Sequence, residues 1–176
     1  MDTRMFKISR KKIAAILAIS AGAVGILILV GMRLFGSRIR QPVAFNHRVH
    51  TENDMACEDC HFYFSQHAFS GRPALEVCAQ CHEEALGKSR EEKKVVDFIA
   101  SGQEIDWQRI FRLPEDVYFS HRRHVKSGEV SCETCHGDIG QTETPPPRPL
   151  KKMTMKTCMG CHEKQDASND CISCHR

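Results

Sequence analysis

The chain has 176 residues, of which ten are cysteine, 41% are hydrophobic and 27% are charged. The chain has 25 basic and 22 acidic residues, which give a net charge of +3. Six of the basic residues and one acidic residue lie at or before Arg33, so the remainder has 19 basic and 21 acidic residues. The rest of the chain therefore lacks the basic surface that a nucleic-acid-binding protein needs.

The first predicted element is a long apolar helix that follows a basic tail. Residues 13–32 include no charged side chain, and about 20 such residues are needed to cross a bilayer. We predict a transmembrane signal-anchor helix over residues 13–35, with the basic tail 1–12 in the cytoplasm and residues 36–176 outside. A cleavable signal peptide is the alternative, since Ala21-Gly22-Ala23 is an A-x-A pattern, but the apolar run continues to Val30, which favours retention.

All ten cysteines fall into five CxxCH motifs. The motifs are Cys57, Cys60 and His61; Cys78, Cys81 and His82; Cys132, Cys135 and His136; Cys158, Cys161 and His162; and Cys171, Cys174 and His175. In this motif both thiols bind one haem covalently and the histidine ligates its iron. Structural zinc and thioredoxin-like chemistry also use CxxC pairs, but neither requires a histidine after every pair. We predict five covalently bound haem c groups, attached after export and therefore located in the periplasm.

Two parts of the chain repeat each other. Residues 45–50 read FNHRVH and precede Cys57, while residues 119–124 read FSHRRH and precede Cys132. Each segment is followed by two CxxCH motifs. The pattern predicts duplicated two-haem units at about residues 43–84 and 117–163, with a fifth haem site added at 171–175.

The stretch between the units predicts one longer helix. Ser89 and Glu92 form a capping-box pattern, an apolar stripe follows, and Gly102 ends the helix, which we expect to pack against haem faces. A proline-rich segment at residues 144–149 predicts an extended spacer. The outer domain has about 140 residues and few aliphatic side chains, so its interior is expected to be packed by haem among short α-helices and loops.

Five histidines lie outside the motifs and supply candidate distal ligands for the iron atoms. His47 and His50, and likewise His121 and His124, are three residues apart, so one helical turn places both imidazoles on one side. The fifth distal ligand is left open between His67 and Met155. Two imidazoles saturate an iron and leave no position for a substrate, which favours electron transfer over catalysis.

These motifs carry a family resemblance. Residues 45–61 and 119–136 resemble the class III cytochromes of the c3/c7 type, whose FxHxxH segment supplies distal ligands to two haems. The stretches 105–109 and 113–137, with Thr154-Met155, resemble the pentahaem subunit of alternative complex III, and the multihaem subunit of the quinone reductase complex of sulfate reducers is similar in the same places. The chain departs from the alternative complex III pattern at Phe111-Arg112, where a histidine is expected, and at His67, which has no clear counterpart in that family.

The resemblance implies a c3/c7-like multihaem cytochrome c with one N-terminal transmembrane helix. It further implies an electron-transfer subunit between an integral membrane quinone-binding subunit, an iron-sulfur subunit and a periplasmic cytochrome c or similar carrier, with no catalytic residue of its own. The direction of electron flow is left open. Two alternatives are a free-standing membrane-anchored quinol-linked cytochrome that feeds a periplasmic reductase, and a multihaem enzyme with an open haem site.

Overall fold

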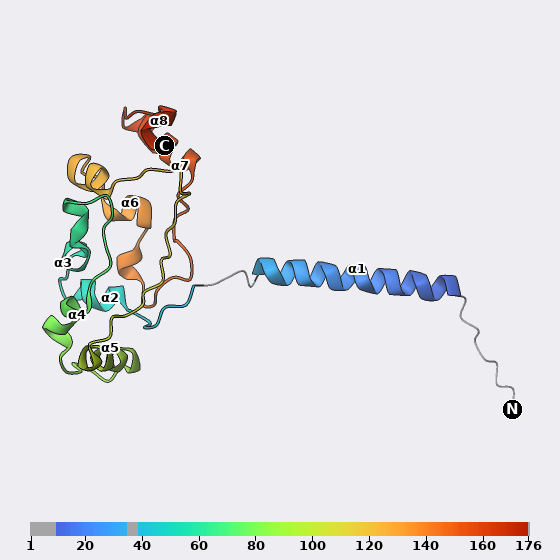
Figure 1. Cartoon of the computed structure of the whole chain (residues 1–176), viewed down its shortest axis with the longest axis horizontal. Helices are drawn as coiled ribbons and strands as arrows, with labels where there is room; N and C mark the ends of the chain where they lie inside the picture. The colour runs from blue at the N-terminus through green and yellow to red at the C-terminus, as the bar shows by residue number, and fades with distance from the viewer. Residues whose placement is uncertain (1–9, 35–38, 176) are drawn as a thin grey trace. The chain divides into compact units, whose positions relative to one another are not determined.

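The computed structural model describes residues 10–34 and 39–175. The chain divides into an N-terminal unit, Met1–Arg38, and a C-terminal unit, Ile39–Arg176. The N-terminal unit contains one helix, α1, over Arg10–Leu34 (Figure 1). Residues 1–9 of the predicted basic tail lie outside the described residues, as do residue 35 at the end of the predicted span and residues 36–38.

A helix therefore forms where the apolar run predicts one. Ser20, a polar residue in this run, donates its hydroxyl hydrogen to the carbonyl oxygen of Ile16 at 2.7 Å. Within residues 10–34 and 39–175, no helix combines the length and the apolar composition needed to cross a membrane. The predicted transmembrane span is thus unsupported by the structure.

The C-terminal unit consists of short helices joined by loops, as expected. Its elements are α2 (His47–Glu52), α3 (Cys57–Cys60), η1 (Phe62–Ser65), α4 (Leu75–His82), α5 (Arg90–Ser101), η2 (Arg122–Ser127), α6 (Cys132–His136), η3 (Ile139–Gln141), α7 (Met155–Lys164) and α8 (Cys171–Cys174). Elements η1 and η3 are 3₁₀-helices and η2 is a π-helix. In the described part of the chain, β pairing is limited to one antiparallel bridge between Val117 and His175.

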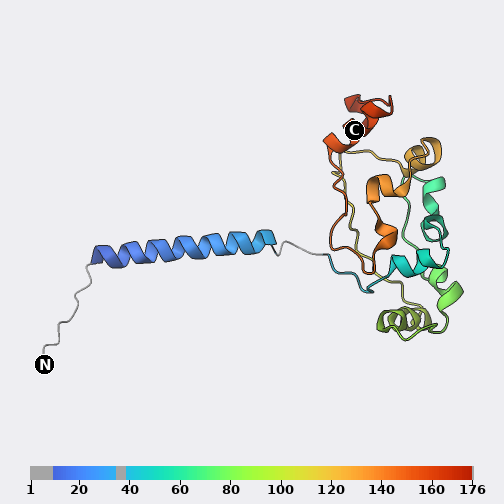
Figure 2. The same ribbon diagram turned by 180° about the vertical axis from the view of Figure 1, so that it is seen from behind.

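All five CxxC segments lie in helices, namely α3, α4, α6, α7 and α8. A helical turn brings residues three apart to the same side, so each segment presents both thiols together. Within the C-terminal unit, α4 and α5 lie at one end, α7 and α8 lie at the other, and α3 and α6 lie between them (Figures 1 and 2). The attachment sites are therefore spread along the length of this unit.

A small side-chain core is present at the α4–α5 end. Among the described residues it consists of four buried hydrophobic side chains, Val43, Leu75, Val95 and Ile105. Phe98, Ile99 and Trp107 are partly buried against it. The apolar stripe of α5 thus contacts side chains of this core, and Cys78 lies beside them.

Helix α5 has the predicted extent, but one predicted contact differs. Ser89 caps it by accepting from the amide of Glu91 at 3.2 Å, and Gly102 ends it with a φ of 66°. This left-handed φ suits glycine, which has no Cβ to oppose it. The carboxylate of Glu92 does not close a capping box; it accepts from the amides of Leu86 and Gly87, because the preceding loop folds back over the helix start.

Candidate haem-binding sites

The five CxxCH motifs define five sites, numbered in chain order. Site 1 contains Cys57, Cys60 and His61; site 2 contains Cys78, Cys81 and His82; site 3 contains Cys132, Cys135 and His136; site 4 contains Cys158, Cys161 and His162; site 5 contains Cys171, Cys174 and His175. None of the ten cysteines is in a disulfide, so every thiol is available to bind haem. Each site thus presents two thiols and an imidazole within five consecutive residues.

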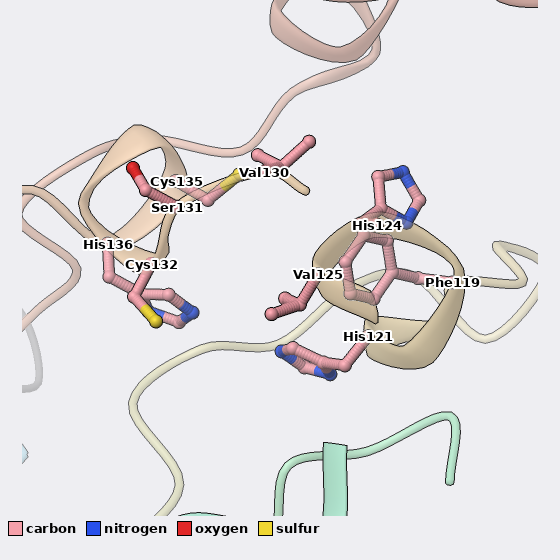
Figure 3. Close-up of a pocket in the computed structure, with 9 residues that line it drawn as sticks. All are labelled: Phe119, His121, His124, Val125, Val130, Ser131, Cys132, Cys135 and His136. Carbon is pink, nitrogen blue, oxygen red and sulfur yellow. The ribbon is translucent and has the colours of Figure 1, made fainter. Parts of the chain in front are cut away.

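Site 3 lines a pocket that also receives a histidine from the preceding FxHxxH segment. Figure 3 shows Cys132, Cys135 and His136 on one side of this pocket and His121 on the other. Val125 and Val130 contribute apolar walls. Two thiols, two imidazoles and an apolar lining are the set of groups that hold a c-type haem, so the residues present fit this cofactor.

The spacing of three imidazole pairs also fits ligation of one iron by two histidines. Metal–imidazole bonds are about 2 Å long, so two rings on opposite sides of one iron have centres about 6 Å apart. The ring centres of His50 and His82 are 6.2 Å apart, those of His121 and His136 are 6.3 Å apart, and those of His124 and His162 are 6.0 Å apart. The structure thus pairs three predicted distal histidines with sites 2, 3 and 4 respectively.

The orientation of most of these rings is fixed through Nδ1. Backbone carbonyl oxygens lie next to Nδ1 in five cases: Asn46 for His50 (2.7 Å), Gly71 for His61 (3.1 Å), Ala68 for His121 (3.0 Å), Ser120 for His124 (2.8 Å) and Ser168 for His162 (2.6 Å). The hydroxyl oxygen of Thr142 lies 3.2 Å from Nδ1 of His47. An imidazole held through Nδ1 presents its free Nε2 for a metal, which is the usual arrangement around a histidine ligand.

Phenylalanines orient both FxHxxH segments in the same way. Phe45 meets the ring of His47 edge-on, with centres 4.8 Å apart, and stacks on His50 at 4.5 Å. Phe119 meets His121 edge-on at 4.9 Å and stacks on His124 at 4.5 Å. Although α2 is an α-helix and η2 a π-helix, the two segments present their imidazoles with the same local geometry.

Electrostatics keep the inner histidines neutral. Burial, followed by the charges of His61 and His50, lowers the pKa of His47 from 6.5 to about 4. Burial also lowers the pKa of His136, with the charges of His121 and His61 adding to the effect. A neutral imidazole keeps the lone pair that a metal requires.

Sites 1, 2 and 3 are neighbours. Helix α2 carries both His47, which lies near site 1, and His50, which pairs with site 2. Burial, then the charge of Cys57 and a hydrogen bond with it, raises the pKa of Cys132 to about 11, so a thiol of site 1 contacts a thiol of site 3. Site 1 therefore lies between sites 2 and 3.

Sites 3, 4 and 5 continue the series. His121 and His124 stand three residues apart and face sites 3 and 4 respectively. The side-chain amide of Asn169, just before site 5, donates to the carbonyl of Met159 in site 4 at 3.2 Å, which places site 5 beside site 4. The amide of Tyr118 also donates to the carbonyl of Cys174 at 2.7 Å, so site 5 is fastened to the start of the second FxHxxH segment. The five sites thus follow one another in the order 2, 1, 3, 4, 5.

The two candidates for the fifth distal ligand are both exposed. The ring of His67 stacks on Phe69 with centres 5.4 Å apart, and within the described residues its Nδ1 has no acceptor. Met155 begins α7 one turn before Cys158 and is 63% exposed. The structure pairs neither residue with His175, so the choice between them stays open.

Several contacts that hold the site histidines were not foreseen in the sequence. The carbonyls of Ala68, Gly71 and Ser168 carry no side-chain signal, since any residue type supplies a carbonyl. Two carboxylates were also missed: Glu92 lies 3.2 Å from Nδ1 of His82, and Asp116 lies 3.0 Å from Nδ1 of His175. The capping pattern assigned Glu92 a different partner, and Asp116 is 59 residues away from its histidine.

The histidines and cysteines form pairs suited to haem. Across residues 10–34 and 39–175, no group of three or more His, Cys, Asp or Glu side chains is arranged to hold a metal ion by itself. Haem supplies four nitrogen ligands and a one-electron iron couple, so the protein needs to add only two axial groups. The chain's role at each site is to bind the porphyrin edge, orient the axial imidazoles and exclude water.

Comparisons with known proteins agree with this chemistry. Residues 117–176 match the family of cytochrome c7 and related cytochrome c, and residues 32–109 match the class III cytochrome c family. The menaquinone reductase multiheme cytochrome c subunit of Nitratidesulfovibrio vulgaris (strain Hildenborough) is 30% identical over 165 residues, covering 80% of this chain and 79% of that protein. The chain therefore belongs to the class III/c7-like multihaem cytochromes c.

Proposed function

We propose that this protein is the electron-relay subunit of a membrane quinone reductase complex and carries five haem c groups. The observation that carries the proposal is the unbroken series of neighbouring sites 2, 1, 3, 4 and 5. Haems held at neighbouring sites would exchange single electrons, with one iron oxidised as the next is reduced, so the chain itself would need no substrate site. The two ends of the series then serve different redox partners.

The axial ligands follow from the ring pairs and from the duplication. His50, His121 and His124 serve sites 2, 3 and 4, because each lies at the spacing of two imidazoles on one iron. His47 serves site 1, in the role that His121 has in the second segment. Four sites thereby have two imidazoles, which leaves no open iron position there and argues against the multihaem-enzyme alternative.

Site 5 takes its distal ligand from His67 or from Met155. The variants His67→Ala and Met155→Ala decide between them, because loss of the true ligand converts one haem from low-spin to high-spin in the EPR spectrum of the oxidised protein. Methionine ligation would also give site 5 a higher potential than the bis-histidine sites. If neither variant changes the spectrum, neither residue is the ligand.

The partners are proposed from the similarity to the menaquinone reductase multiheme cytochrome c subunit of Nitratidesulfovibrio vulgaris. A quinone-binding integral membrane subunit and an iron-sulfur subunit would meet one end of the series, and a periplasmic cytochrome c or similar carrier would meet the other. The alternative complex III resemblance leaves quinol oxidation as the competing direction. Because haem attachment follows export, we place the C-terminal unit on the periplasmic face of the cytoplasmic membrane.

The test is gentle purification from membranes through a tag on this chain, with identification of the proteins that accompany it. The haems of the isolated complex are then reduced and a menaquinone analogue is added. We expect quinone-binding and iron-sulfur subunits to co-purify and all five haems to be reoxidised together. A chain that purifies alone, with haems that do not respond to the quinone, would contradict the proposal.

A further inference from the structure

Two site histidines have a carboxylate next to Nδ1. Six others have a backbone carbonyl or a hydroxyl at this nitrogen, both of which are uncharged. In contrast, Glu92 approaches His82 and Asp116 approaches His175. These two histidines belong to sites 2 and 5, the two ends of the series.

The Glu92 carboxylate is held firmly in its position. Its Oε1 accepts from the amide of Leu86 at 2.7 Å, and its Oε2 accepts from the amide of Gly87 at 3.0 Å. Oε1 also lies 3.2 Å from Nδ1 of His82, and the two side chains are only 13% and 21% exposed. Nδ1 of His82 is buried and has no hydrogen-bond partner within the described residues, so Glu92 acts on this ring through its charge at 3.2 Å.

A carboxylate beside Nδ1 would act on a haem iron held by Nε2 of the same ring. Its negative charge would stabilise the additional positive charge of the ferric state and so favour ferric over ferrous iron. A neutral carbonyl would do this less strongly. The effect of the charge is also larger in a half-buried, low-dielectric site than in water.

We propose that Glu92 lowers the reduction potential of the haem at site 2, and that Asp116 acts in the same way, more weakly, at site 5. The inference rests on the proposed haem attachment at these sites. Glu92 is a positioning residue, because it acts on the iron through His82.

The test is a spectroelectrochemical titration of the full-length, haem-loaded protein carrying Glu92→Gln. Glutamine keeps the shape and removes the charge, so one of the haem waves should move to higher potential. We expect at least a tenfold change in the ratio of reduced to oxidised haem at that site, which is about 59 mV for a one-electron couple. The conservative variant Glu92→Asp should retain most of the lower potential, since it keeps the charge.

Asp97→Asn is the matched control. Asp97 lies on the same helix, is exposed, and pairs with Lys93 at 3.1 Å without contacting a histidine. This variant also removes one negative charge, yet it should leave every wave in place. Equal shifts in Glu92→Gln and Asp97→Asn, or no shift in either, would overturn the proposal.

A second variant decides the matter if Glu92→Gln does not accumulate with its haems. Asp116→Asn should raise the potential of a different wave by a smaller amount, because the Asp116 side chain is 64% exposed and water screens its charge. Absence of any shift in Asp116→Asn would then overturn the inference. These outcomes concern haem potentials alone. The proposed function is tested separately, by the subunits that co-purify and by the response of the haems to quinone.

Discussion

Replacing Phe119 with leucine should destabilise the protein by about 1–3 kcal/mol. Phe119 makes two aromatic contacts, one edge-on with His121 at 4.9 Å and one stacked with His124 at 4.5 Å. Each such pair contributes about 0.5–1.5 kcal/mol beyond the burial of apolar area, and leucine keeps the apolar bulk while losing both contacts. The variant Phe45→Leu should cost the same, because the first segment repeats these contacts.

The assay is guanidinium unfolding of the haem-loaded protein, followed by haem absorbance, together with EPR of the oxidised state. Broadened low-spin signals are expected as well, because the rings of His121 and His124 lose the neighbour that fixes their orientation. Phe64→Leu is the control, since the Phe64 ring is half-buried but makes no aromatic contact within the described residues, and the change should cost less than Phe119→Leu. Equal stability losses in Phe119→Leu and Phe64→Leu would refute the reasoning.

Gly71→Ala should destabilise the protein by about 1–3 kcal/mol. Gly71 has a φ of 80°, and an added Cβ would collide with the ring of Tyr63 and move the carbonyl that lies next to Nδ1 of His61. EPR and unfolding test this against Gly22→Ala in α1, whose Cβ meets nothing within 4 Å. Hydrogen bonds from the amide of Ala44 and then from Lys94 lower the pKa of Glu91 below 4.5. The wild type should therefore be more stable than Glu91→Gln above pH 4.5, and this difference in the free energy of unfolding should vanish as pH falls through the lowered pKa. Unfolding curves at pH 7 and pH 3 measure this difference, which a constant gap would contradict. Finally, the chain produced without attached haem should show no cooperative thermal unfolding by circular dichroism. Within the described residues its buried hydrophobic side chains lie at the α4–α5 end, so the rest of the unit needs haem to fold. A sharp transition would show that haem is dispensable for folding.

Local features of the site were predictable from the sequence because they depend on residues a few positions apart. The three-residue step of each CxxC segment places two thiols on one helical turn, and the step from His121 to His124 directs two imidazoles to neighbouring sites. The extent of α5 was likewise predicted from Ser89 and Gly102. A helix also forms over the apolar run near the N-terminus, but the described structure does not support the membrane span predicted there.

The order of the sites was decided only by tertiary structure. Site 1 lies beside site 3 because Cys57 is hydrogen-bonded to Cys132, and site 5 lies beside site 4 because the side chain of Asn169 donates to the carbonyl of Met159. No local pattern encodes the first of these contacts, since it joins thiols 75 positions apart through the folding of the chain between them. The carboxylates at the two ends of the series were equally hidden in the sequence, because the hydrogen-bond partner of a glutamate or aspartate depends on which backbone and which ring the fold brings within reach.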